Sequence, residues 1–320
     1  MVSSKTVFNT AFVMKNIGVL WDKEVSWDGD TAFGDVIDET YEYFSTLGLE
    51  EDVQLLIGKY NWYSDGVMEK SWKFDGENWV KVEDVELDGV FDKFHFDEET
   101  KKIKQSMAES PGIINDPDLE ELCKDKLMTY ERFSEHVPET RKASEANIDE
   151  MLNEFGKVVL KPRFAYGAEG LHIIDRSDEV PEIENNDYIV QRFVDSSKGI
   201  DGLVEGSHDL RAILVDGEVK GCYVRYNEDS EISNVSEGGV KEAVSIDEFP
   251  DSALEIIEEV NEDIEYSPAL FSVDLFFDPE GRPWIIELNS KPGLNFFGEE
   301  ELKKQITPIM KALIESFRKL

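Results

Sequence analysis

The chain has 320 residues, of which 40% are hydrophobic, so it is long enough for two domains and apolar enough to bury a core, which excludes a disordered protein. It carries 33 basic and 71 acidic residues and a formal net charge of −38, which excludes binding to nucleic acid or an anionic membrane through a general basic surface. This charge favours a solvated acidic shell and a salt-loving (halophilic) source, with attraction to cationic partners as the alternative.

The beginning of the sequence and the cysteines and histidines indicate a reducing, aqueous compartment. The apolar stretch at residues 11–20 is interrupted by Lys15 and Asn16, which makes it too polar for a signal-peptide core and too short to span a bilayer. Cys123 and Cys222 lie far apart, and the four histidines show no ligand spacing, so neither a disulfide framework nor a metal motif is predicted from them. We therefore expect a soluble, cytoplasmic protein.

The first 110 residues predict a small α/β domain, because strand and helix patterns alternate along them. The expected elements are a strand at 7–14, a helix at 33–49, a strand at 52–58, a hairpin at 70–82 with its turn at Asp75–Gly76, a strand at 88–94 and a helix at 97–110. No G-x-G-x-x-G motif occurs here, so no dinucleotide site is predicted.

The next region begins with a long helix at 115–135, capped by Asn115 or Asp116 and with Pro117 in its first turn. A second helix at 144–155 and mostly antiparallel strands follow. The expected strands lie at 157–163, 171–176 and 187–195, in a hairpin at 208–227 about Asp216–Gly217, and in a last hairpin at 271–289. Helices are expected at 252–264 and 299–320, and residues 196–207 read as a loop or linker.

The last hairpin predicts a patch of oxygen ligands. If residues 278–283 form the loop, Phe277 faces Trp284 and Asp274 faces Glu287, while Asn289 shares the face of Glu287 because side chains alternate along a strand. Two carboxylates and an amide oxygen suit Mg²⁺ that also holds phosphate oxygens. The alternative is the solvated face of an acidic protein.

Two further patterns carry positive charge. Lys161 ends an apolar strand and precedes a loop with Gly167 and Gly170, which would let backbone amides approach phosphate oxygens. Arg211 and Arg225 lie on adjacent strands of one hairpin, where they can neutralise charge on a phosphate or an oxyanion. The alternatives are an ordinary hairpin loop with an exposed lysine, and cross-strand pairing of the arginines with surface acids.

The ordered set of these motifs resembles the ATP-grasp superfamily. It comprises Lys126, "VPET", "VLKP" with its glycine loop, "YIVQRFV", "HDLR", Arg225, "SNVSEGG" and "VDLFFDPEGRPWIIELNSKPG". The likeness covers roughly residues 111–315 and is greatest to the glutathione-synthetase-like ligases, especially those that add glutamate to the tail of a ribosomal protein. It implies an α/β (α+β) ATP-grasp fold with an N-terminal domain at 1–110, a lid subdomain at 111–190 and a C-terminal subdomain with the metal site at 191–320.

The resemblance also implies roles for single residues. Lys126 and Lys161 would hold the α- and β-phosphates of ATP, and the loop from Gly167 to Gly170 would close over them. The adenine-binding hinge would be formed by Gln191, Arg192, Phe193 and Val194. The Mg²⁺ ligands would be Asp274, Glu287 and Asn289, for two ions that Mn²⁺ can replace. Groups near the reacting phosphate and acyl centre would be Arg211, Arg225 and Asn234.

Two departures from the family pattern concern the nucleotide. Arg192 stands where relatives usually have an acid, and the segment after the hinge is longer than expected. The acid that binds the ribose is therefore one of Asp195, Asp201 and Glu205.

The resemblance implies an ATP-dependent carboxylate–amine ligase that acts through an acylphosphate and releases ADP. The substrates would be a small-molecule or peptide carboxylate and an amine, without nucleic acid or membrane, and no pattern in the sequence sets an oligomeric state. A phosphotransferase of the same fold and a non-catalytic nucleotide-binding module are the alternatives, and an acidic scaffold for basic partners explains none of the motifs.

Overall fold

The computed structural model describes residues 14–165, 170–183, 187–227, 240–296 and 298–320. The chain divides into two compact units. The first comprises Met1–His95, Ser106–Ile113 and Ile314–Leu320, and the second comprises Phe96–Gln105 and Ile114–Leu313. Helices and sheets are mixed in both, as expected.

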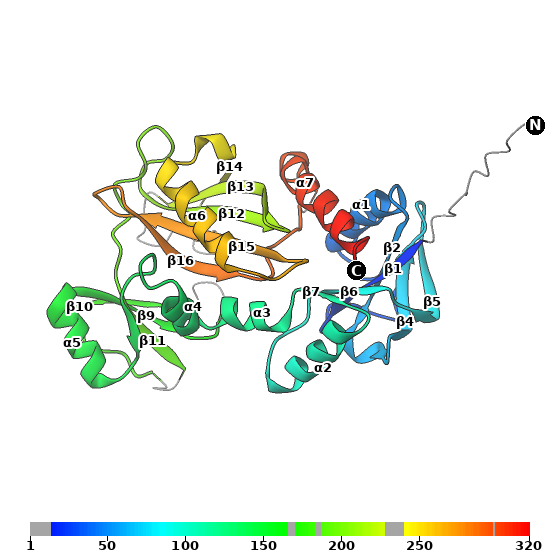
Figure 1. Ribbon diagram of the computed structural model, residues 1–320, viewed down its shortest axis with the longest axis horizontal. Helices are drawn as coiled ribbons and strands as arrows, with labels where there is room; N and C mark the ends of the chain where they lie inside the picture. Colours follow the sequence, from blue (N-terminus) through cyan, green and yellow to red (C-terminus); the bar gives the residue numbers. More distant parts are fainter. Residues whose placement is uncertain (1–13, 166–169, 184–186, 228–239, 297) are drawn as a thin grey trace, which may run out of the picture. The chain divides into compact units, whose positions relative to one another are not determined.

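The first unit contains a sheet in which the central strand β1 runs parallel to both its neighbours (Figure 1). The strand order is β3-β4-β2-β1-β6-β7, with β5 paired to β4. The strands are β1 Lys15–Trp21, β2 Val53–Lys59, β3 Tyr63–Ser64, β4 Val67–Phe74, β5 Trp79–Glu86, β6 Gly89–Asp92 and β7 Ile113–Ile114. The helices are α1 Ile37–Leu49 and the short η1 Tyr60–Trp62. Helix α2 Glu98–Glu109 lies between β6 and β7 in the chain, and its residues are divided between the two units.

The expected helix at 33–49, the strands at 52–58 and 88–94 and the hairpin at 70–82 are confirmed. The expected strand at 7–14 lies outside the described residues except for Met14, which is not in a strand. The first strand among the described residues is β1, where the buried residues Ile17 and Val19 support the centre of the sheet.

The single helix expected at 115–135 is wrong, because this segment forms two helices, α3 Pro117–Lys124 and α4 Lys126–Arg132. Asp116 caps α3 as expected, by accepting a hydrogen bond from the backbone of Asp118. The break falls at Asp125, whose backbone is extended and whose carboxylate accepts from the first backbone N–H groups of α4. The same carboxylate pairs with Arg163, so the cap at the start of α4 and an ion pair with a residue distant in the sequence both stabilise the break between the two helices.

A four-stranded sheet with the order β10-β9-β11-β8 follows, with α5 Glu145–Phe155 on one of its faces (Figure 1). Its strands are β8 Thr140–Lys142, β9 Lys157–Pro162, β10 His172–Asp175 and β11 Tyr188–Arg192. Val158, Leu160 and Val190 pack with α5 in one apolar core. Since side chains alternate along β9, Lys161 projects from the opposite face of this sheet.

A five-stranded sheet with the order β14-β13-β12-β15-β16 completes the second unit, with α6 Asp251–Asp263 packed against it. Its strands are β12 Ser207–Val215, β13 Glu218–Asn227, β14 Val240–Ala243, β15 Leu270–Phe277 and β16 Pro283–Asn289. The 3-10 turn η3 Ile246–Glu248 precedes α6, and α7 Glu300–Phe317 follows the sheet. The hairpins expected at 208–227 and 271–289 are confirmed.

The register of the last hairpin matches the expectation at one end only. Asp274 pairs with Glu287, as expected, but Phe277 pairs with Pro283 rather than with Trp284. An irregularity after Asp274 adds one residue to β16 and shifts the register by one position. The turn is one residue shorter than expected, because Pro283 already belongs to β16, and the added residue compensates for this difference at Asp274 and Glu287.

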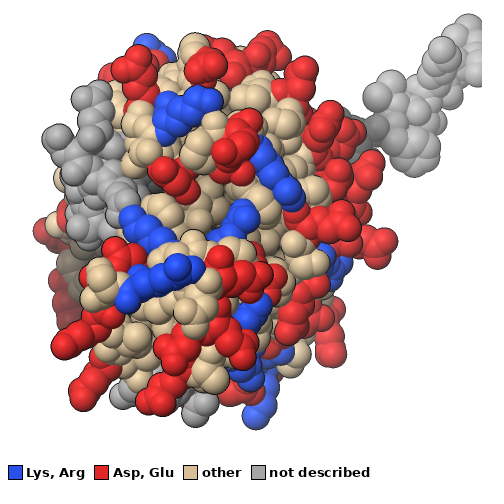
Figure 2. Space-filling view, turned by 90° about the vertical axis from the view of Figure 1, so that its left-hand side faces the viewer, with Lys and Arg blue, Asp and Glu red and all other residues tan. Residues whose placement is uncertain are grey.

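Acidic side chains are spread over the face of the molecule in Figure 2, with fewer basic ones between them. This distribution agrees with a solvated acidic shell. Among the described residues, no helix is long and apolar enough to cross a membrane.

Candidate active site

Lys161 is a buried ammonium group that lies beside a second lysine. Its residue is 8% exposed, and burial lowers its pKa to about 8, helped by the charge of Lys126 and opposed by Glu287. Within the described ranges of the chain, Lys161 has no hydrogen-bond acceptor or ion-pair partner. Burying a charged ammonium without an acidic partner costs free energy, so an anion that binds beside Lys161 would be stabilised by its charge.

Lys126 begins α4 and faces the end of the last hairpin. Its Nζ donates to the backbone oxygen of Ala165 and lies 3.5 Å from Oε1 of Glu287. Gly170 has a φ of +73°, and a Cβ there would lie 2.7 Å from the hydroxyl of Tyr188, so this end of the loop requires glycine. The predicted phosphate contact at Gly167 lies outside the described residues.

The three predicted metal ligands converge. Nδ2 of Asn289 lies 3.5 Å from Oδ2 of Asp274 and 3.3 Å from Oε2 of Glu287. Rotating this amide exchanges its nitrogen and oxygen and would present a third oxygen to the same point. Such a donor set fits Mg²⁺. Within the described residues no cluster of three Asp, Glu, His or Cys side chains can hold a metal, so the amide and added phosphate or water oxygens would complete the coordination.

The predicted arginines bind the metal-site carboxylate. Arg211 lies opposite Asp274 in the sheet and holds it through two nitrogens, with Nε 2.6 Å from Oδ1. Arg225 lies opposite Asp209 and also reaches Oδ2 of Asp274 at 2.8 Å. The two arginines are therefore diagonal neighbours rather than a directly facing pair. Burial opposes the charge of Arg211, but Asp274 outweighs it and keeps the pKa of the guanidinium above its ordinary value.

Lys241 on β14 joins this cationic group, and sequence reasoning missed it. It pairs directly with Arg225 across the strands, and its Nζ lies 4.0 Å from the centre of the Tyr223 ring. Burial, together with Arg211 and Arg225, lowers the pKa of Lys241 to about 8. Only its position two residues after "SNVSEGG" could have drawn attention to it. Asn234, predicted in that motif, lies outside the described residues.

The predicted hinge connects β11 to the third sheet. Gln191 donates to the hydroxyl of Thr140 at 2.8 Å, and the backbone N–H of Arg192 donates to the oxygen of Glu139 at 2.8 Å. Phe193 lies under Nζ of Lys157, 4.2 Å from the ring centre, and Val194 is buried in the structure. The backbone N–H of Phe193 also donates to the oxygen of Lys157 at 3.4 Å, so the hinge is held by side chains and by two backbone N–H groups.

Of the three acids considered for the ribose, Asp195 has a carboxylate that is held by hydrogen bonds within its own loop. It accepts hydrogen bonds from Ser197, which lower the pKa of its carboxyl. Asp201 and Glu205 line a separate cavity of about 630 Å³ within the loop at 197–206.

Comparison with known proteins gives one family match. The sequence profile of the ATP-grasp domain matches residues 123–293. The tetrahydromethanopterin:alpha-L-glutamate ligase of Methanocaldococcus jannaschii is 29% identical over 198 residues, which cover 56% of this chain and 62% of that protein. The chain thus spans less than two thirds of the length of this relative.

Solved structures match over almost the whole chain. D-alanyl-alanine synthetase A from Vibrio cholerae superposes with a TM-score of 0.60 at 16% identity, covering 96% of this chain and 100% of that one. A RiPP-associated ATP-grasp ligase from Chryseobacterium gregarium, in complex with ADP and a leader and core peptide, gives 0.57 at 14% identity, covering 96% and 97%. At these identities the likeness establishes a common fold.

Proposed function

Because the chain belongs to the ATP-grasp domain family, we propose that it is an ADP-forming carboxylate–amine ligase. The observation that carries this proposal is the buried ammonium of Lys161, which has no acidic partner among the described residues and lies beside Lys126 and Glu287. Two adjacent cations in a chain of net charge −38 require an anion, and the phosphates of a nucleotide supply one. The glutamate ligase and the peptide-bound ligase named above support this class of reaction.

The nucleotide would lie between the four-stranded and the five-stranded sheet of the second unit. Lys126 and Lys161 would hold the α- and β-phosphates, and Gly167 and Gly170 would belong to the loop that closes over them. Backbone groups of residues 191–194 would read the adenine edge, and Asp195 is our choice for the ribose hydroxyls because Ser197 already fixes its carboxylate.

Mg²⁺ would be held by Asp274, Glu287 and Asn289, with two ions and Mn²⁺ as a substitute, and would neutralise charge on the phosphate oxygens when bound. The chain's own residues would act around the reacting carboxylate. Arg225 would stabilise the tetrahedral oxyanion, and Arg211 would orient the acyl group beside it.

In the proposed reaction the substrate carboxylate attacks the γ-phosphorus of ATP, the bond to the bridging oxygen breaks, and ADP leaves. An amine then attacks the acyl carbon of the acylphosphate, loses a proton, and expels phosphate as the amide forms. Exclusion of water by the loop would protect the acylphosphate from hydrolysis. The substrates would be amino acids or peptides.

The test is ADP release from Mg-ATP in concentrated KCl, against pools of amino acids and short peptides, with hydroxylamine added. Carboxylate-dependent ADP release with a trapped hydroxamate supports the ligase. A stable phosphorylated product with no amide bond supports a phosphotransferase instead, and nucleotide binding without turnover in any pool supports a binding module.

Two variants connect this reaction to the site. Glu287→Gln removes one charge from the metal patch and should abolish ADP formation while leaving the fold intact. Glu280→Gln, in the exposed turn of the same hairpin, should retain turnover. Full turnover in Glu287→Gln would contradict the metal assignment.

A further inference from the structure

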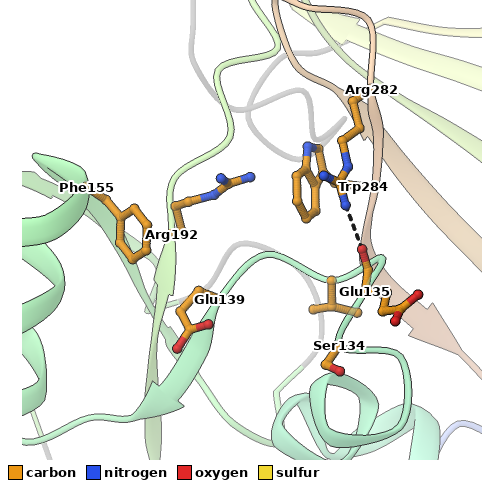
Figure 3. A pocket seen from close by; sticks show the side chains of 8 residues that line it. Ser134, Glu135, Glu139, Phe155, Arg192, Arg282 and Trp284 are labelled. Carbon is orange, nitrogen blue, oxygen red and sulfur yellow. Dashed lines mark hydrogen bonds between the residues drawn. The ribbon is translucent and has the colours of Figure 1, made fainter.

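A pocket of about 450 Å³ lies beside the hinge, and the proposed function does not use it (Figure 3). Arg192 faces Val158 across β9 and β11, so its side chain leaves from the α5 face of the sheet, whereas Lys161 leaves from the other face. Phe155, the last residue of α5, lines the same pocket. The pocket is therefore on the opposite side of β11 from the proposed nucleotide site.

Two guanidinium groups converge on one tryptophan in this pocket. The guanidinium carbon of Arg192 lies 4.3 Å from the centre of the Trp284 ring, and that of Arg282 lies 3.9 Å from it. Figure 3 shows Arg192 reaching toward Trp284 from β11, while Arg282 descends beside the same ring from the hairpin. Both guanidinium groups thus lie against an aromatic ring, and their N–H groups, apart from the one that Arg282 donates to the backbone of Glu135, remain for a ligand.

In the part of the chain that the structure describes, no carboxylate oxygen forms an ion pair with the guanidinium nitrogens of Arg192 or Arg282. Asp278 accepts from the backbone N–H of Arg282 at 2.8 Å and not from its side chain. Arg282 donates to the backbone oxygen of Glu135 at 2.8 Å, and Nε of Arg192 is buried without an acceptor. By contrast, Arg163 and Arg211 are each held by an aspartate. In a chain with 71 acidic residues, a buried guanidinium nitrogen left without an oxygen acceptor marks a site for an external oxyanion.

The lining indicates the class of ligand. A planar carboxylate or a phosphate accepts two parallel hydrogen bonds from a guanidinium fork. Trp284 and Phe155 add aromatic surface for the body of the ligand, and the volume is that of a small-molecule site. The carboxylate of Glu139, which also lines the pocket, is already bonded to Tyr130 and Arg141 and so competes little for the two guanidiniums.

The pocket is physically connected to the hinge. The backbone N–H of Arg192 donates to the oxygen of Glu139, which ties together the two segments that enter and leave the second sheet. A ligand that binds the Arg192 side chain therefore contacts the same residue whose backbone would form hydrogen bonds with the adenine.

We propose that this pocket binds a small aromatic or apolar oxyanion and that its occupancy changes the affinity for nucleotide. The binding of an oxyanion is inferred from the pocket alone, whereas the effect on nucleotide affinity rests on the proposed function.

The test uses protein labelled with 5-fluorotryptophan, in which the ¹⁹F signal of Trp284 is assigned from Trp284→Phe. Benzoate and phenyl phosphate are titrated without nucleotide to about 10 mM, which would fill about nine tenths of a site with a Kd of about 1 mM. Benzamide serves as the uncharged control. The same titrations are run on Arg192→Gln, on the exposed Arg282→Gln and on the matched control Arg132→Gln, which lies outside the pocket.

We expect a saturable shift of the Trp284 signal with benzoate, phenyl phosphate or both, lost in Arg192→Gln and Arg282→Gln and retained in Arg132→Gln. The probe that binds identifies carboxylate or phosphate as the natural group. No shift, an equal shift with benzamide, or a shift that persists in both pocket variants overturns the site and leaves ordered water as the partner of Arg192. The Kd of Mg-ADP, measured by calorimetry with and without the bound probe, should change by about fivefold or more. An unchanged Kd with the probe bound overturns the coupling alone.

Discussion

The affinity for nucleotide should fall as the pH rises through the pKa of Lys161. This pKa is about 8 in the free protein, against an ordinary 10.5, because burial and Lys126 disfavour the charged form. Phosphates at the site would favour that form, so binding takes up a proton above pH 8. The gap between 8 and 10.5 corresponds to about 3 kcal/mol, which is the size of this coupling when bound phosphates restore the ordinary pKa.

Full restoration of the charge predicts a Kd for ADP about tenfold higher at pH 9 than at pH 7, since affinity falls up to tenfold for each pH unit above 8. Calorimetry at both pH values, in buffers of different ionisation enthalpy, measures the Kd and the proton uptake together. Lys161→Arg should bind with no such slope, because a guanidinium stays charged. Lys142→Met, an exposed lysine of the same sheet, serves as the control.

The stability of the nucleotide-free protein should change with pH in the opposite direction to the nucleotide affinity. The pKa of Lys161 is lower in the folded than in the unfolded state, so the charged form costs stability below pH 8, and this cost is relieved as the pH rises toward 10.5. The free energy of unfolding should therefore rise over this window relative to Lys161→Met. Equal Kd values at pH 7 and pH 9, or a slope that persists in Lys161→Arg, would falsify the assignment of Lys161 to phosphate.

Three further outcomes are expected. Lys241→Met should raise KM for the carboxylate substrate more than it lowers kcat, because Lys241 extends the cationic group beyond the reacting centre. Steady-state kinetics measure both constants, and a change in kcat alone would contradict this role. Asp125→Asn keeps a cap for α4 but loses the charge that binds Arg163, so thermal unfolding should show a loss of about 2 kcal/mol, and an unchanged midpoint would exclude a stabilising role. Mg²⁺ should bind several-fold more weakly without ADP than with it, because Arg211 holds Asp274 in the free protein. Calorimetry, corrected for the association of Mg²⁺ with ADP in solution, measures both affinities, and equal values would refute the prediction.

The sequence predicts one end of the last hairpin correctly through two differences that cancel. A turn at 278–283 with regular alternation places Asp274 opposite Glu287, and that pairing is present. Pro283 already belongs to β16 and pairs with Phe277, so the turn is one residue shorter than predicted and the pairing of Phe277 with Trp284 is wrong. The extra residue in β16 after Asp274 then restores the predicted register, and neither the turn boundary nor this irregularity leaves a trace in the hydrophobic pattern.

Other features depend on contacts that are distant in the sequence. Asp125 reads as one more polar residue of an amphipathic helix, and its capping role emerges only with Arg163 folded against it. Lys241 has no motif of its own and becomes significant through its cross-strand position beside Arg225. Patterns of local periodicity predict elements, whereas partners selected by tertiary packing decide where elements break and which charges meet.

The charges of the proposed site have partners in the free protein that substrates would replace. Asp274 is held by Arg211 and Arg225, and Glu287 lies near Lys126, so each carboxylate assigned to the metal neutralises a base assigned to a phosphate or an oxyanion. Binding would exchange these partners: the acids would turn to the cation and the bases to the anion. An exchange conserves the number of paired charges, so the buried site avoids an isolated charge at either stage. Lys161 is the exception, since it has no acidic partner among the described residues, and it is therefore the residue that most directly requires the nucleotide.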